Sequence, residues 1–170
     1  MKALNCFKAL SAALIIAAGV SAQTIWNGTF DTTWYTNNKN ATSYTITTAE
    51  QLAGLAQLVN GNANNGTYYM SGKTITLGAN IMLNDTTNWQ NWATSAPANT
   101  WTVIGNNSNP FYGTFNGAGY VVGGGYINNE SDNQGLFGYV GSGVIRNLGV
   151  VASYVKGTFF SPCLVASCLL

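Results

Sequence analysis

Acidic side chains are the first candidates for chemistry, because the 170-residue sequence has five of them and no histidine. Glycosidases use two convergent carboxyl groups, about 5–9.5 Å apart. Glu130 and Asp132 are two positions apart and would share one face of a strand. Their Asn and Ser neighbours instead favour a solvated loop, whose oxygens could hold a calcium ion weakly. We therefore expect no catalytic residue and no bound metal, with Glu130 and Asp132 as weak calcium candidates.

The missing histidines remove several classes of enzyme. Without imidazole, a serine or cysteine nucleophile lacks its usual base, and an HExxH zinc site is impossible. Six Lys and Arg residues against five Asp and Glu give a formal charge of +1. Nucleic-acid binding needs clustered cations to neutralise phosphates, so nucleic acid is not an expected partner. We expect no enzyme activity and no cofactor.

Aromatic side chains offer a second kind of site. The chain has five Trp and nine Tyr residues, and flat aromatic faces can stack on sugar rings. Trp89 and Trp92 lie in an Asn-rich segment without periodicity, residues 84–99, where they would be exposed to a ligand. The alternative is that they pack this segment onto the body of the protein. Trp89 and Trp92 are thus weak ligand-binding candidates.

The first 22 residues have the pattern of a signal peptide. Lys2 and Lys8 precede an apolar run from Ala9 to Val20, and a small-residue cleavage pattern ends at Ala22. The run is shorter than the ~20 apolar residues of a spanning helix. We expect export to the cell surface or the medium, with no membrane span in the mature chain.

A single helix is predicted within the segment 47–60, before Gly61. Thr47 or Thr48 can cap its first turn, with Glu50 or Gln51 placed for a capping box. Gly61 stands where a left-handed C-terminal cap is wanted. The apolar positions follow a helical spacing and form one face: 52, 55, 56 and 59.

The remainder of the chain predicts short strands separated by tight corners. Candidate strands occupy residues 43–47, 74–77, 81–83 and 101–105. More than half of the 20 glycines fall between Gly113 and Gly149, a density that disfavours helices and long strands.

Apolar pairs recur about 20–25 residues apart, which is within the range of solenoid repeats. The pairs are Ile81 with Ile104, Val121 with Val144, and Ile127 with Leu148. The fold expected is mainly β: a short parallel β-solenoid (β-helix) with one N-terminal capping α-helix. The alternative is a β-sandwich, which would need longer strands and two-residue hairpin turns.

Residues 135–140 and 143–150 resemble the GLUG repeat of bacterial surface proteins, including adhesin-like proteins and the N-terminal region of IgA1-specific metallopeptidases. Segments 47–60, 73–85, 101–105 and 111–119 are similar to the sequence that precedes the repeat in such proteins. The motif is carried by seven residues: Gly135, Leu136, Phe137, Gly138, Asn147, Leu148 and Gly149. In these peptidases the zinc motif lies in a separate domain, so the resemblance implies architecture rather than proteolysis.

Three parts of the chain follow from these patterns: a signal peptide (1–22), one GLUG-like β-solenoid domain (23–157) and an atypical apolar tail (158–170). The tail departs from the repeat pattern, and we expect a truncated or frame-shifted product of a longer gene. The function expected is a secreted or cell-surface, non-enzymatic, adhesin-like module that binds an extracellular protein or glycan. The alternative is a carbohydrate-binding or carbohydrate-active β-helix protein.

Overall fold

The computed structural model describes residues 24–62, 66–158 and 165–168, so the predicted signal peptide lies outside the described residues. Short strands dominate the regular structure, and all of their pairings are parallel within this part of the chain. Helical elements are α1 (Thr33–Thr36), α2 (Ala49–Asn60) and the 3-10 turn η1 (Trp89–Asn91).

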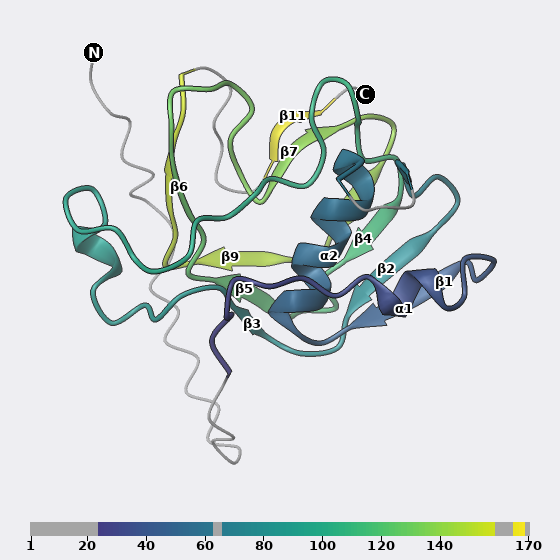
Figure 1. The fold of residues 1–170 in the computed structure, drawn as a ribbon, viewed down its shortest axis with the longest axis horizontal. Coiled ribbons are helices and arrows are strands. Elements are labelled where there is room, and N and C mark those ends of the chain that lie inside the picture. Colours follow the sequence, from purple (N-terminus) through teal and green to yellow (C-terminus); the bar gives the residue numbers. More distant parts are fainter. Residues whose placement is uncertain (1–23, 63–65, 159–164, 169–170) are drawn as a thin grey trace.

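The largest sheet has the order β1–β2–β4–β8, of which β1, β2 and β4 are labelled in Figure 1. Its strands are β1 (Ser43–Ile46), β2 (Thr74–Leu77), β4 (Thr114–Asn116) and β8 (Val144–Arg146). The second sheet contains β3 (Ile81–Met82), β5 (Val121–Gly123) and β9 (Gly149–Val151). Two further pairs join β6 (Tyr126–Asn128) to β10 (Tyr154–Lys156), and β7 (Phe137–Val140) to β11 (Val165–Cys168). Within each sheet, neighbouring strands follow one another in chain order.

The register places like side chains above one another. Tyr44, Ile75, Phe115 and Ile145 are successive partners across the four strands of the largest sheet. Val122 pairs with Val150 in the second sheet. Because side chains alternate along a strand, such a register sends one apolar row from each sheet into the core.

The apolar spacing predicted from the sequence is wrong as a guide to these partners. Ile81 pairs with Val122 rather than Ile104, Val121 with Gly149 rather than Val144, and Ile127 with Val155 rather than Leu148. The observed separation is 28 positions for the last two pairs. The chain runs through several short strands before it returns, and the connecting loops differ in length. Of the apolar pairs 21–23 positions apart, Val121 and Val144 lie in different sheets, whereas Ile104 and Leu148 lie outside the named strands.

Helix α2 has the caps and the apolar face expected from the sequence. Thr48 accepts a hydrogen bond from the Gln51 amide at 3.3 Å, and the Gln51 side chain accepts one from the Thr47 amide at 2.8 Å. Gly61 ends the helix with a φ of 78°. The predicted apolar positions are buried, as are several of their neighbours: Leu52, Leu55, Ala56 and Val59 with Ala49, Ala53 and Leu58.

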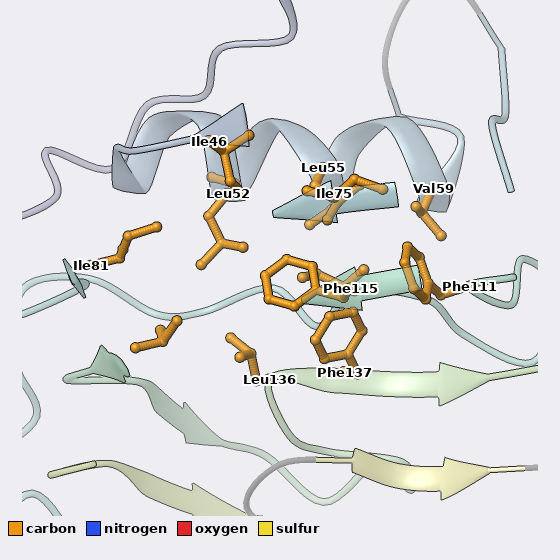
Figure 2. Close-up of a cluster of buried hydrophobic side chains, with 14 of the residues drawn as sticks. Ile46, Leu52, Leu55, Val59, Ile75, Ile81, Phe111, Phe115, Leu136 and Phe137 are labelled. Atoms are coloured by element: carbon orange, nitrogen blue, oxygen red, sulfur yellow. The ribbon is translucent and has the colours of Figure 1, made fainter. Parts of the chain in front are cut away.

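The core lies beneath α2 and is rich in phenylalanine (Figure 2). Phe111, Phe115 and Phe137 are fully buried, and the Phe137 ring centroid lies 5.3 Å from that of Phe111 and 5.2 Å from that of Phe115. Leu52 and Leu55 point from the helix toward this cluster (Figure 2). The helix thus covers one end of the stacked apolar rows.

Two single helical turns, α1 and η1, were not expected. Both follow an aspartate that fixes the chain just before the turn: Asp31 accepts hydrogen bonds from Thr33, and Asp85 from Thr87. One turn has too few residues to show a helical period, so hydrophobic periodicity cannot predict it. The aspartate followed two residues later by a hydrogen-bonded threonine is an Asx turn, which is the local sequence signal for such a turn.

The edge opposite α2 is less well covered. Strands β8, β9 and β10 are the outermost members of their sheets, and their side chains are half-buried or exposed. Val144 and Val151 are 50% and 43% exposed. Residues 165–168 of the predicted tail form β11, whose backbone pairs with β7.

Candidate binding site

The clearest irregularity in the sheets is the loop of residues 84–99 between β3 and β4, which contains η1 and projects from the body of the protein (Figure 1). It lengthens one return of the chain within the largest sheet. Successive partners Ile75 and Phe115 are 40 positions apart, whereas Phe115 and Ile145 are 30 apart. Insertions in repeat architectures commonly map to loops on a binding face.

Two asparagines fasten the base of this loop. The Asn84 amide nitrogen donates to the carbonyls of Asn99 and Gly124, both at 2.9 Å. In return, the Asn99 backbone amide donates to Asn84 Oδ1 at 2.9 Å. The Asn99 side chain donates to the carbonyls of Trp26 at 2.7 Å and Leu83 at 3.2 Å. The loop is therefore anchored at both ends by amide hydrogen bonds, one of them buried and the others partly buried.

The loop and the N-terminal segment enclose a pocket of about 340 Å³. The segment is held in place because Ile25 forms a parallel bridge to Met82, and the Trp26 amide donates to the Met82 carbonyl at 3.1 Å. The pocket lining joins residues about 60 positions apart in the sequence: Ile25, Trp26, Asn84, Asp85, Thr87, Asn88, Trp92, Ser95, Ala96, Pro97, Ala98 and Asn99.

Of the two predicted ligand-binding tryptophans, Trp92 lines the pocket and Trp89 is not among its lining residues. Trp92 is 3% exposed and packs edge-on against Tyr126, with 5.9 Å between ring centroids. Trp89 is half-buried in η1. Trp92 therefore packs the loop onto the body of the protein, and its ring has no open face on which a sugar could stack.

Asp85 supplies the charge in the pocket. Its Oδ1 accepts hydrogen bonds from the Thr87 hydroxyl at 2.5 Å and the Thr87 amide at 2.9 Å. These two bonds, the hydroxyl first, lower the pKa of the exposed Asp85 carboxyl below its usual 3.8. The folded protein therefore favours the ionised form. Its contribution to stability is present above the ordinary pKa and is lost as the pH falls through the lowered one.

Apart from Asp85, the described residues of the pocket lining are neutral. The polar ones are amides and hydroxyls, and the others are two tryptophans, Ile25 and smaller apolar side chains. Such a pocket attracts no anion, and a single carboxylate is a poor substitute for the six to eight oxygens that calcium takes. The chemistry it can perform is hydrogen bonding to a neutral polar molecule.

Glu130 and Asp132 lie elsewhere, in the loop between β6 and β7. Glu130 forms an exposed ion pair with Lys156 at 3.6 Å. Asp132 accepts a hydrogen bond from the Thr158 hydroxyl, which also donates to the Glu130 carbonyl at 3.1 Å. The two acids thus tie this loop to the last residue of β10, Lys156, and to Thr158 just beyond it. Across the described ranges, no three His, Cys, Asp or Glu residues gather closely enough to hold a metal ion.

The residues of the GLUG-like motif are mostly buried or closely packed. Leu136 and Phe137 are buried in the core. A Cβ on Gly138 would lie 2.5 Å from the Gly105 carbonyl oxygen, so this position admits no side chain without a shift of the backbone. Asn147 has a φ of 52°. Gly135 lies just before β7. Leu148 lies between β8 and β9 and packs half-buried against the core, and Gly149 is the first residue of β9.

Sequence reasoning missed most of the pocket. Asn84 and Asn99 were part of an unperiodic segment, and Trp26 lies far from them in the chain. The one local signal was the Asp85-Thr86-Thr87 sequence, since an aspartate two residues before a threonine favours an Asx turn. The remaining positions depend on which strands pair.

Comparison with known proteins assigns no family. No family model matches the chain, and no solved structure matches it. A protein of Evansella cellulosilytica, named "Putative Gly-rich membrane protein", is 44% identical over 57 residues. The match covers 32% of this chain and 7% of that relative. Of the helices in the described residues, none has both the length and the apolar character to cross a bilayer. The chain is similar to a short stretch of a glycine-rich protein.

Proposed function

We propose that the chain is a short parallel β-solenoid that serves as an exported, non-enzymatic, adhesin-like binding module. The observation that carries the proposal is the repeated register: β1–β2–β4–β8 and β3–β5–β9 both add parallel strands in the same chain order. A stack of this kind is rigid and carries its loops at fixed positions, which suits recognition rather than catalysis.

The acids support a binding role because most of them are engaged in local structure. Asp31 and Asp85 each accept two hydrogen bonds in Asx turns. Glu130 and Asp132 contact Lys156 and Thr158. A glycosidase needs two acids that converge on one bond. These residues instead hold separate loops, and the sequence offers no histidine to replace them.

Paired cysteines test the solenoid. Asn116→Cys with Arg146→Cys joins register partners of β4 and β8, and Asn128→Cys with Lys156→Cys joins those of β6 and β10. Neighbouring parallel strands bring such residues within the ~4.4–6.8 Å between Cα atoms that a disulfide spans. We expect both pairs to oxidise rapidly in the folded protein, as measured by mass spectrometry.

The control uses the spacing suggested by the sequence. Val121→Cys with Val144→Cys places cysteines 23 positions apart that are not register partners, and this pair should stay reduced. Rapid oxidation of the control, or failure of both register pairs, would contradict the solenoid. Variants with only one of the two introduced cysteines show whether any disulfide forms with the native Cys6, Cys163 or Cys168.

Function is tested with the purified protein on a panel of extracellular glycoproteins and polysaccharides. The proposal expects saturable binding without release of reducing sugar or peptide. Product release would identify an enzyme, and absence of binding across the panel would contradict the adhesin-like role. Export is tested separately, because signal-peptide cleavage predicts a secreted chain that begins at Gln23.

A further inference from the structure

We propose that the pocket between residues 25–26 and the loop 84–99 binds one unit of a neutral saccharide, with Asp85 and Asn88 as its hydrogen-bonding groups. This inference rests on the proposed binding function and names its site and ligand class. The pocket is built from the inserted loop, which lies outside the stacked strands.

The walls of the pocket are preorganised. The Asn84–Asn99 pair holds the two ends of the loop together and ties Asn99 to Trp26 across the pocket. The Asn84 backbone also packs closely against Gly124, since a Cβ on Gly124 would lie 2.7 Å from it. A ligand would meet a formed site, and little binding free energy would be lost in ordering the loop.

Polar groups remain for a ligand after these internal bonds are made. Asp85 uses Oδ1 for both Thr87 bonds, so Oδ2 can accept from hydroxyl groups. Asn88 is exposed and its amide both donates and accepts. An ionised carboxylate beside an amide matches adjacent hydroxyls, because hydroxyls donate to the first and exchange hydrogen bonds with the second.

The apolar part of the lining can contact the C–H groups of a sugar ring. Trp26 and Trp92 form part of the wall, and Ala96 and Pro97 add small apolar surface. Sugar rings carry C–H groups as well as hydroxyls, so a pocket with both kinds of wall can bury both. The volume of about 340 Å³ is at the lower end of ligand pockets, about 300–1,000 Å³, and suits one ring rather than a long chain.

Charge decides between neutral and acidic saccharides. Among the described residues that line the pocket, Asp85 alone is charged, and none is a Lys or an Arg. A uronic acid or a sialic acid would place a second negative charge in the pocket without a cation to pair it, which costs free energy. We therefore infer selectivity for uncharged rings.

The test measures binding of methyl α-mannoside, maltose, lactose and N-acetylglucosamine, with galacturonate and sialyllactose as acidic probes. Titration calorimetry gives affinities, and tryptophan fluorescence reports on the pocket because Trp26 and Trp92 line it. The variants are Asp85→Asn and Asn88→Ala. Losing a hydrogen bond to a charged group should weaken binding by about tenfold or more.

Matched controls separate recognition from folding. Asp31→Asn alters the same kind of Asx turn, since Asp31 Oδ1 accepts from the Thr33 amide and hydroxyl, but Asp31 lies outside the pocket. Gln90→Ala removes an exposed amide of the same loop that does not line the pocket. Both controls should keep the affinity of the unaltered protein.

The outcomes are distinct. Binding of at least one neutral probe that is lost in Asp85→Asn and kept in Asp31→Asn supports the inference. Preference for an acidic probe, equal affinity in all four variants, or no binding of any neutral probe overturns it. If neutral probes fail while an extracellular glycoprotein or polysaccharide still binds, the pocket inference is wrong and the proposed binding function stands.

Discussion

Two ends of the protein share one strand register but differ in how deeply it buries their side chains. One end lies beneath α2, and the other is the edge formed by β8, β9 and β10. Ile75 and Ile145 belong to one row, with Phe115 between them. Ile75 is fully buried, whereas Ile145 is half-buried. The difference comes from what lies above each residue: α2 covers the row at one end, and β8 is the outermost strand at the other.

This comparison shows that register alone does not make a core. Parallel pairing aligns apolar rows, but each row gains stability only when a neighbouring layer removes it from water. The most stable part of the protein should therefore lie beneath α2. Six substitutions in four tests check that expectation, from the largest effect to the smallest.

Ile75→Ala and Ile145→Ala compare the same change at two positions of one row. Deleting a fully buried isoleucine side chain costs about 2–5 kcal/mol of unfolding free energy, since a cavity remains. The half-buried Ile145 should cost less than half as much as Ile75. Denaturant unfolding of both variants measures the difference, and equal losses would contradict the comparison.

Gly54→Ala and Gly149→Ala compare close approach at the two ends. Alanine normally favours a helix over glycine by about 1 kcal/mol. A Cβ on Gly54, however, would lie 1.9 Å from the Asp31 carbonyl oxygen, so we expect destabilisation by about 1–3 kcal/mol.

At Gly149 the nearest atom would be the Val121 Cγ1 at 3.0 Å, and a side-chain methyl can move more easily than a backbone carbonyl. This variant should stay within about 1 kcal/mol of the unaltered protein. Thermal unfolding distinguishes the two, and a stabilised Gly54→Ala protein would show that α2 packs less tightly on residue 31.

The pH dependence of stability tests the burial of Tyr35, at the end of the protein that α2 covers. Burial first, and then the neighbouring Tyr44 and Tyr68, raise the pKa of Tyr35 above its usual 10.0. The folded state favours the neutral phenol, so this contribution to stability is present below pH 10 and is lost as the pH rises toward the raised pKa. In Tyr35→Phe, the free energy of unfolding should fall less steeply with pH than in the unaltered protein. The difference should be seen between about pH 9 and 11, one unit either side of the ordinary pKa. An unchanged slope in urea unfolding would argue against this role.

Lys156→Gln tests the ion pair at the outer edge. Lys156 Nζ lies 3.6 Å from Glu130, and both side chains are largely exposed. Exposed pairs contribute about 0–1 kcal/mol and are screened by salt. We expect a change below about 0.5 kcal/mol that vanishes at high ionic strength. A loss as large as that of Ile75→Ala would show that the edge is as well fixed as the end beneath α2.

Local sequence determined the elements with strong local chemistry. The limits of α2 follow from Thr48, Gln51 and Gly61, because capping groups act within a few residues of the helix ends. Strands β1, β2 and β3 were also close to their predicted positions, since alternating or consecutive β-branched and apolar residues favour extended chain. The sequence also excluded imidazole chemistry, which depends on composition alone.

Tertiary structure decided which strands are partners and where the pocket forms. The partner of Ile81 is Val122, 41 positions away, because the long loop 84–99 intervenes before the chain returns. Trp92 is buried because the loop folds back against Tyr126, and Trp26 reaches the pocket through the Asn99 side chain. Such contacts join residues that are distant in the chain, and they depend on loop lengths and backbone hydrogen bonds that no local pattern records.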